Sequence, residues 1–231
     1  MSASILIIGE SGTGKSTSIR TLNHKETAII NVLDKPLPFK GYRSMYGKSE
    51  DGKHNYLATD NSAKICQSMD LISTNRPDIK NIVIDDFQYI MANEFMRKSD
   101  EKGFNKFTEI ARNAWNVLKK ASELRSDIIC FILSHSSCDD MGVKKTKTIG
   151  KLLDEKISIE GMFTVVLHSM IRDNSYKFLT NTENGFLAKS PMDMFSSLLI
   201  DNDLNFVRNT HEEYMGSDVF VDESKPVEEM V

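Results

Sequence analysis

Five short apolar runs recur along the chain and predict the strands of a buried sheet. Each run is rich in β-branched residues and lacks a regular alternation of apolar and polar positions, which is typical of strands buried on both faces of a parallel sheet. The runs lie at residues 4–8, 28–33, 82–84, 128–133 and 163–167. We therefore expect a mostly parallel sheet at the core.

Helical patterns separate these runs. The clearest is an apolar stripe with spacings of three and four residues, which predicts a helix over residues 106–125. The stripe consists of Phe107, Ile110, Ala111, Ala114, Leu118 and Ala121. Because strand and helix patterns alternate along the chain, we expect an α/β fold in which helices flank the sheet.

The pattern changes after residue 167. Two short segments, 176–180 and 186–188, are separated by Asn184-Gly185, a pair that favours a tight turn between antiparallel strands. This pattern predicts a C-terminal antiparallel hairpin. Residues 36–56 lack any periodicity, and we expect them to form a loop.

Charge divides the chain into two parts. The formal net charge is -4, but residues 211–231 carry seven acids and one base, so the rest of the chain is nearly neutral. We therefore expect one domain over residues 1–210 and an acidic, mobile tail over residues 211–231. Any anion-binding surface on the domain must be local.

Cysteine use and hydropathy point to the cytoplasm. Cys66, Cys130 and Cys138 form no CxxC pair, and an odd number of cysteines cannot all close into intramolecular disulfides. No apolar stretch approaches the ~18 residues that would span a bilayer. We expect a cytoplasmic protein with no membrane partner.

The segment Gly9-Glu10-Ser11-Gly12-Thr13-Gly14-Lys15-Ser16-Thr17 matches the phosphate-binding pattern G-x-x-x-x-G-K-[ST] in full. Its glycines let backbone N–H groups face phosphate oxygens, and a helix expected over residues 16–22 adds its positive N-terminal end. We expect Lys15 to contact the β- and γ-phosphates, Ser16 to bind Mg²⁺, and Thr17 to lie near the α-phosphate. A chance match in a glycine-rich turn is the alternative, but the strand pattern before the loop favours a site for ATP with Mg²⁺.

Two carboxylates end the third apolar run. Asp85 is expected to hold Mg²⁺ through water, and Asp86 to orient or deprotonate an attacking water. The alternative is that Asp86 caps a helix over residues 87–96.

The fourth run ends in Ser134-His135-Ser136. If this strand lies between the other two, Ser134 or His135 sits beside the γ-phosphate and senses it. A loop serine and a surface histidine are the alternative.

A basic cluster follows, made of Lys144, Lys145, Lys147 and Lys151. Such clusters are often solvated surface. The functional alternatives are a mobile loop that grips nucleic-acid phosphates, or a lysine that acts on ATP held by a neighbouring subunit.

Five segments together resemble the small RecA-like P-loop ATPases encoded by bacteriophages, some of which act as single-strand annealing or recombination proteins. The segments are GESGTGKST, NIVIDDFQYI, LSHSS, KKTKTIGKLLDEKI and FLTNTENGFLAKSP, and the resemblance spans roughly residues 4–195. It implies a RecA-like ATPase core with Mg²⁺-ATP, located in the cytoplasm of a bacterial host. It also implies single-stranded DNA as partner, assembly into a ring or filament, and a single-strand-binding protein as a further partner.

The roles of Lys15, Ser16 and Asp85 carry over directly from this resemblance, and those of Asp86, Ser134, His135 and the lysines less directly. One departure concerns the glutamate that larger RecA-type recombinases carry after an earlier strand, because Glu26 and Glu50 are poor candidates for it. Three functions remain open: a DNA-recombination ATPase, a helicase-loading or packaging ATPase, and a small-molecule or nucleotide kinase. The presence of lysines, where a kinase lid would use arginines, favours the first.

Overall fold

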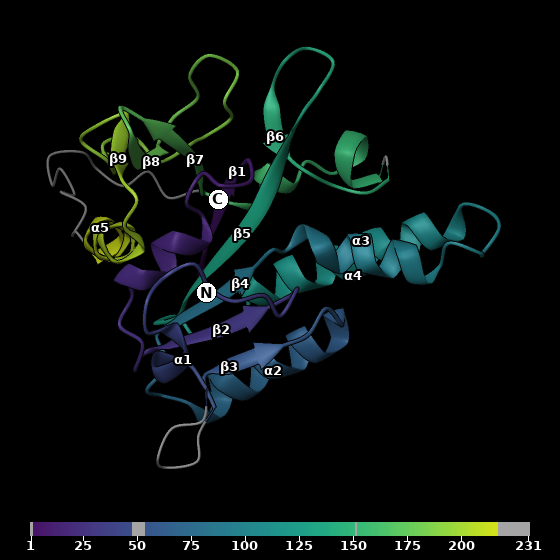
Figure 1. Ribbon diagram of the computed structural model, residues 1–231, viewed down its shortest axis with the longest axis horizontal. Coiled ribbons are helices and arrows are strands. Elements are labelled where there is room, and N and C mark those ends of the chain that lie inside the picture. Colours follow the sequence, from purple (N-terminus) through teal and green to yellow (C-terminus); the bar gives the residue numbers. More distant parts are fainter. Residues whose placement is uncertain (1, 48–53, 151, 217–231) are drawn as a thin grey trace, which may run out of the picture.

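A computed structural model describes residues 2–47, 54–150 and 152–216, and its centre is a mixed sheet (Figure 1). The strands follow the order β3-β2-β4-β5-β1-β7-β8-β9, and β6 pairs with the end of β5. Their bounds are β1 (Ala3–Gly9), β2 (Thr27–Asn31), β3 (Tyr56–Ala58), β4 (Asn81–Asp85), β5 (Ile129–Cys138), β6 (Lys144–Thr146), β7 (Val165–Arg172), β8 (Ser175–Leu179) and β9 (Leu199–Asp201). The six strands from β3 to β7 run parallel, whereas β6 and β8 run antiparallel to their neighbours. The predicted α/β fold with a mostly parallel sheet is confirmed.

Successive strand residues supply two separate cores, one on each face of the sheet. Leu6 and Ile8 of β1 belong to one cluster, and Ile5 and Ile7 belong to the other. All four side chains are fully buried. This is why the predicted runs do not alternate, because both faces of each central strand need apolar side chains.

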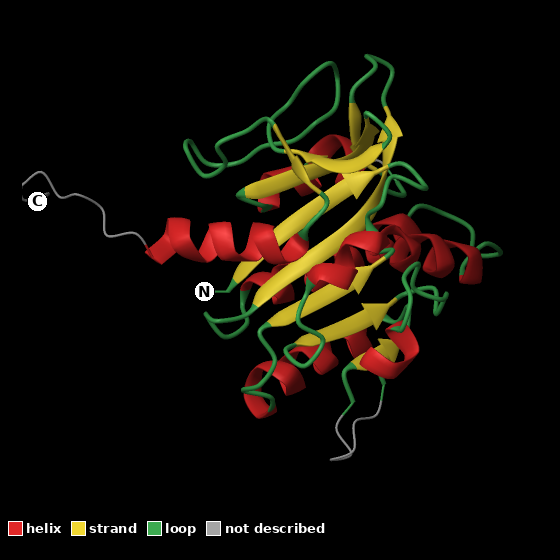
Figure 2. Ribbon diagram, turned by 60° about the vertical axis from the view of Figure 1, so that its left-hand side comes forward, coloured by secondary structure: helices red, strands yellow, loops and turns green. Residues whose placement is uncertain are grey.

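Helices cover both faces (Figure 2). The first core packs against α2 (Ser62–Asn75), α3 (Gln88–Arg97) and α4 (Asn105–Ser122), and the second against η1 (Ser16–Thr21) and α5 (Leu204–Gly216). Shorter elements are α1 (Tyr42–Met45), the π-helical turn η2 (Leu152–Lys156) and η3 (Ile159–Met162). The predicted stripe on α4 is buried from Ile110 to Ala121, which confirms that helix, although it ends at Ser122. No helix in the described ranges is both long and apolar enough to cross a membrane.

The predicted hairpin between segments 176–180 and 186–188 is wrong in its pairing. β7 extends to Arg172, five residues beyond the predicted end, and pairs with β8 through a turn at Asp173 and Asn174. Both turn residues have positive φ (50° and 57°), as a two-residue hairpin turn requires. The tight turn at Asn184-Gly185 does form, but it joins no pair of named strands. It places Phe186 in a single bridge with Lys144.

Two other boundaries differ from the expectation. α5 continues through residue 210 to Gly216 without interruption, so residues 211–216 are helical, while the acidic segment 217–231 lies outside the described residues. The expected loop over residues 36–56 contains α1 and the first residue of β3. Leu37 and Tyr46 pack into the second core and so anchor residues 36–47 despite the lack of periodicity.

Candidate functional site

The phosphate loop lies where neighbouring parallel strands end together. β5 lies between β1 and β4, so Gly9 at the end of β1 is level with His135, and Asp85 ends β4 on the far side of β5. The expectation that the fourth predicted strand separates the other two is confirmed. Ligands of open α/β sheets bind at this carboxyl edge.

The loop has the backbone that a phosphate cradle needs. Gly12 and Gly14 adopt positive φ values of 80° and 97°, which favour glycine. A Cβ on Gly9 would lie 2.6 Å from the backbone oxygen of Ser169 in β7, so this position admits no side chain. The Ser169 hydroxyl donates to the Thr13 carbonyl (2.6 Å), and the Thr13 hydroxyl donates to the Glu10 carbonyl (2.9 Å). β7 therefore supports the phosphate loop through Ser169.

The helix expected after the loop is present as a 3₁₀ helix, η1. Its hydroxyl side chains bond back to the backbone: Ser18 donates to the Lys15 carbonyl, and Thr21 donates to the Ser18 carbonyl. Hydroxyl groups compete in this way with regular helical hydrogen bonding, and the tighter turn persists for six residues.

Lys15 is buried at the centre of the site. Its Nζ donates to the carbonyls of Gly9 (2.8 Å) and Glu10 (2.7 Å). Burial lowers the pKa of Lys15 to about 8, although Asp86 and Asp85 act in the opposite direction. Because burial removes water from the Lys15 ammonium group, a hydrogen bond to a phosphate oxygen would stabilise it strongly. This fits the predicted contact of Lys15 with the β- and γ-phosphates.

Ser16 and Asp85, the two residues predicted to bind the metal, are in direct contact. The Ser16 hydroxyl donates to Oδ1 of Asp85 (2.7 Å), and Asp85 is fully buried. Burial raises the pKa of Asp85 to about 6, with the charge of Asp86 adding to the effect. Its second oxygen, Oδ2, is buried and has no hydrogen-bond partner among the described residues. A hydroxyl and a carboxylate oxygen are ligands that Mg²⁺ accepts beside water and phosphate, so these residues fit the ion.

Asp86 is buried beside Asp85 and faces the side chains of Lys35 and His135. It forms an ion pair with Lys35, and Nε2 of His135 lies 3.5 Å from its Oδ1. Burial opposes ionisation, but the hydrogen bonds from His135 and Lys35 outweigh it and lower the pKa of Asp86. Its φ of 64° is unusual outside glycine. The alternative of a helix cap is wrong, because α3 begins at Gln88 and has no side-chain cap.

His135 reaches the site, but Ser134 does not. His135 lines the cavity of about 260 Å³ above the loop, together with Lys15, Ser16 and Asp86. Ser134 is fully buried and points to the Gln88 side chain, which also accepts the His135 backbone N–H (3.0 Å). The predicted end of this strand at Leu133 is also wrong. β5 continues to Cys138, because β6 supplies hydrogen-bond partners for its polar end.

The basic cluster is a strand at its start and not a mobile loop. Lys144 and Lys145 lie in β6, where successive side chains point to opposite faces. Lys144 forms an ion pair with Glu10 of the phosphate loop (2.6 Å), and its Nζ lies 4.4 Å from the centre of the Phe186 ring. Lys147 is exposed just after the strand, and Lys151 lies outside the described residues. The three described lysines, Lys144, Lys145 and Lys147, therefore do not all lie on one face.

Sequence reasoning missed four residues of this region. Lys35 follows β2 and lines the cavity, and Tyr176 of β8 lines it from the other side. Gln88 fixes the His135 backbone, and Asn202 donates to the Gly14 carbonyl (3.2 Å). Lys35 could have been identified from the sequence, because it follows a predicted parallel strand. The other three have none in the local pattern.

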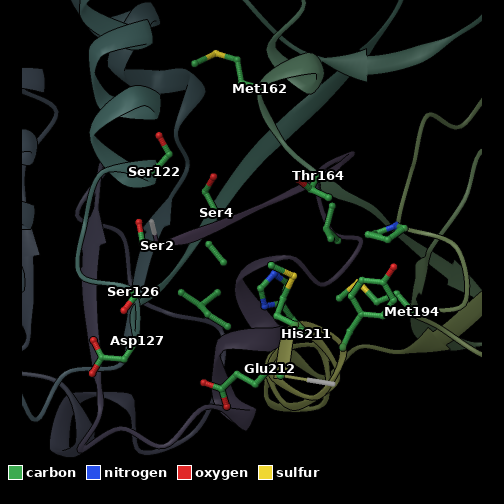
Figure 3. Close-up of a pocket in the computed structure, with 17 residues that line it drawn as sticks. Ser2, Ser4, Ser122, Ser126, Asp127, Met162, Thr164, Met194, His211 and Glu212 are labelled. Atoms are coloured by element: carbon green, nitrogen blue, oxygen red, sulfur yellow. The ribbon is translucent and has the colours of Figure 1, made fainter. Parts of the chain in front are cut away.

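A larger cavity of about 580 Å³ lies at the opposite edge of the sheet, where β1, β5 and β7 begin. Ser2, Ser4 and His211 line it together with Met162 and Met194 (Figure 3). It shares no described residue with the cavity above the phosphate loop. It is therefore separate from the nucleotide site.

Comparison with known proteins agrees with this geometry. A family model described as "AAA domain" matches residues 1–192, which include every described residue that lines the cavity above the phosphate loop. No curated protein matches the chain.

Proposed function

The chain belongs to the AAA domain family of nucleotide-binding ATPases, and we propose that it binds Mg²⁺-ATP through residues 9–17 and hydrolyses it. The observation that carries the proposal is the hydrogen bond from Ser16 to Asp85. It joins the phosphate loop to the acidic end of β4, with Lys15, Asp86 and His135 around the same cavity. These groups are the ones that phosphoryl transfer to water requires.

Each side chain has a distinct part in this reaction. Lys15 exchanges its hydrogen bonds with the loop carbonyls for contacts with the β- and γ-phosphates, whose negative charge stabilises the ammonium group. Ser16 and Asp85 would hold Mg²⁺, which would neutralise negative charge on the phosphates. Because the pKa of Asp86 is held low, Asp86 is a weak base, and we assign it the orientation of the attacking water rather than full proton abstraction. His135 lies beside Asp86 and is the group that senses the γ-phosphate.

We further propose that the partner is single-stranded DNA and that the protein acts in recombination. What supports this is the link between β5 and β6. The Lys147 N–H donates to the His135 carbonyl (2.8 Å), so an exposed lysine lies one backbone hydrogen bond from the phosphate sensor. DNA held at Lys145 and Lys147 is then coupled to the nucleotide state, and ATP should raise DNA affinity as DNA raises ATP affinity.

The remaining parts of this proposal rest on the resemblance to phage RecA-like ATPases. They are a phage origin, self-assembly into a ring or filament, action in the cytoplasm of a bacterial host, and cooperation with a single-strand-binding protein. Helicase loading, packaging and kinase activity are the competing functions.

Phosphate release from Mg²⁺-ATP, measured with and without an oligonucleotide, tests the proposal. We expect hydrolysis that DNA stimulates, and loss of the stimulation in the double variant Lys145→Ala, Lys147→Ala. The matched control removes two exposed lysines elsewhere, Lys25 before β2 and Lys64 on α2, and should keep the stimulation. Hydrolysis without any DNA binding would reject the DNA partner in favour of a loader or kinase. Absence of nucleotide binding would reject the ATPase itself.

A further inference from the structure

The cavity above the phosphate loop has two chemically different ends. In the sheet, β2, β4 and β5 lie on one side of β1, and β7 and β8 lie on the other. Lys35, Asp86 and His135 reach the cavity from the first side, and Tyr176 of β8 reaches it from the second. The charged, hydrolytic groups and the aromatic ring therefore face each other across the loop.

Tyr176 is held against the loop and remains accessible. A Cβ on Gly14 would lie 2.8 Å from Cδ1 of the Tyr176 ring, so the ring packs directly on this glycine. The residue is nevertheless 42% exposed. Asn202, just after β9, donates to the Gly14 carbonyl and accepts a hydrogen bond from Arg20 (3.0 Å), which fixes the loop against the C-terminal strands. The ring thus packs on Gly14 and is still partly exposed to solvent.

The charged end and the aromatic end of the cavity determine the orientation of a bound nucleotide. Its γ-phosphate must face Asp86 and His135, because these groups act on that phosphate and its attacking water. The nucleoside then leaves the loop on the side of β7 and β8. We propose that Tyr176 is the platform on which the nucleobase stacks, an inference that rests on the proposed binding of ATP. Stacking on an aromatic ring contributes affinity without reading the base edge.

Binding of ATP and of inorganic triphosphate, each with Mg²⁺ and measured by calorimetry, tests this role. Triphosphate has the same charged groups but no base. Tyr176→Ala should weaken ATP binding about thirtyfold, the middle of the range for one stacked base, and leave triphosphate binding unchanged. Tyr176→Phe keeps the ring and should bind ATP like the wild type, as should Tyr214→Ala, which removes an exposed tyrosine of α5.

Three results distinguish a failure of the stacking role from a failure of the proposed nucleotide site. Equal ATP affinity in Tyr176→Ala and the wild type would overturn the stacking role. Equal loss of ATP and triphosphate affinity would overturn it as well, because Tyr176 would then only support the loop. If the wild type binds neither compound, the proposed nucleotide site itself fails.

Discussion

The hydroxyl of Ser16 donates a 2.7 Å hydrogen bond to Oδ1 of Asp85, a residue 69 positions further along the chain. The bond connects the start of η1 to the end of β4 and leaves Oδ2 of Asp85 without a partner among the described residues. Because Asp85 is buried, its pKa rises to about 6. A cation bound at this site would therefore stabilise the ionised form of the Asp85 carboxyl group.

Asp85→Asn is predicted to stabilise the nucleotide-free protein at neutral pH while removing its response to Mg²⁺. Since the folded-state pKa of Asp85 is raised from 3.8 to about 6, the folded state binds the proton more tightly than the unfolded state. The resulting stability is present below about pH 4 and is lost as pH rises through 6, a difference of about 3 kcal/mol at most. Asparagine is uncharged and avoids that loss.

Thermal unfolding at pH 5 and pH 7.5, with and without Mg²⁺-ATP, measures both effects. The melting temperature of the variant should exceed that of the wild type more at pH 7.5 than at pH 5. A variant less stable than the wild type at pH 7.5 would show that Asp85 does not carry a buried charge.

Lys35→Met is predicted to shift the acidic limb of the hydrolysis profile to higher pH. The lysine pairs with Asp86, and removing a neighbouring cation raises the pKa of a carboxyl group. His135 remains as the second partner, so the shift should be partial. The measurement is kcat against pH, with Lys40→Met, an exposed lysine of the same segment, as control. An acidic limb that stays in place would mean that Asp86 does not limit the reaction.

The double variant Lys145→Ala, Lys147→Ala is predicted to flatten the salt dependence of DNA binding. Each phosphate contact on a single strand contributes a slope of about 0.7 in log affinity against log salt, so two lost contacts should reduce the slope by about 1.4. The single variant Lys147→Ala should change the slope more than Lys144→Ala, because Lys147 is exposed and Lys144 is paired with Glu10. Fluorescence anisotropy of a labelled oligonucleotide over a salt series gives both slopes. Equal slopes in the wild type and the double variant would remove these lysines from the DNA interface.

Features set by local sequence were predictable, and features set by distant pairing were not. The phosphate loop and the acidic end of β4 each lie within one segment, so their chemistry is visible in the pattern of residues. For β5, the apolar run predicts an end at Leu133, because Ser134, His135 and Ser136 are polar. Its continuation depends on β6, which begins six residues beyond its end.

The position of Tyr176 in the site could not be predicted from the sequence for the same reason. Tyr176 lies near Gly14 only because β7 and β8 form a hairpin next to β1. That hairpin was mispaired in the expectation, since Asp173 and Asn174 are a less obvious turn than Asn184 and Gly185. A side chain that reaches the site through a strand pairing cannot be assigned until the pairing is known.

Equilibrium binding of ATP to the wild type and to Lys15→Ala, with and without Mg²⁺, tests the central claim most directly. Lys15 is buried, its pKa is lowered to about 8, and its partners are loop carbonyls, so its removal should not unfold the protein. The account predicts Mg²⁺-dependent binding to the wild type and at least a tenfold loss in a variant that circular dichroism shows to be folded, since a charge-assisted hydrogen bond contributes about 1.5–3 kcal/mol. Unchanged ATP affinity in folded Lys15→Ala would contradict the assignment of residues 9–17 as the nucleotide site.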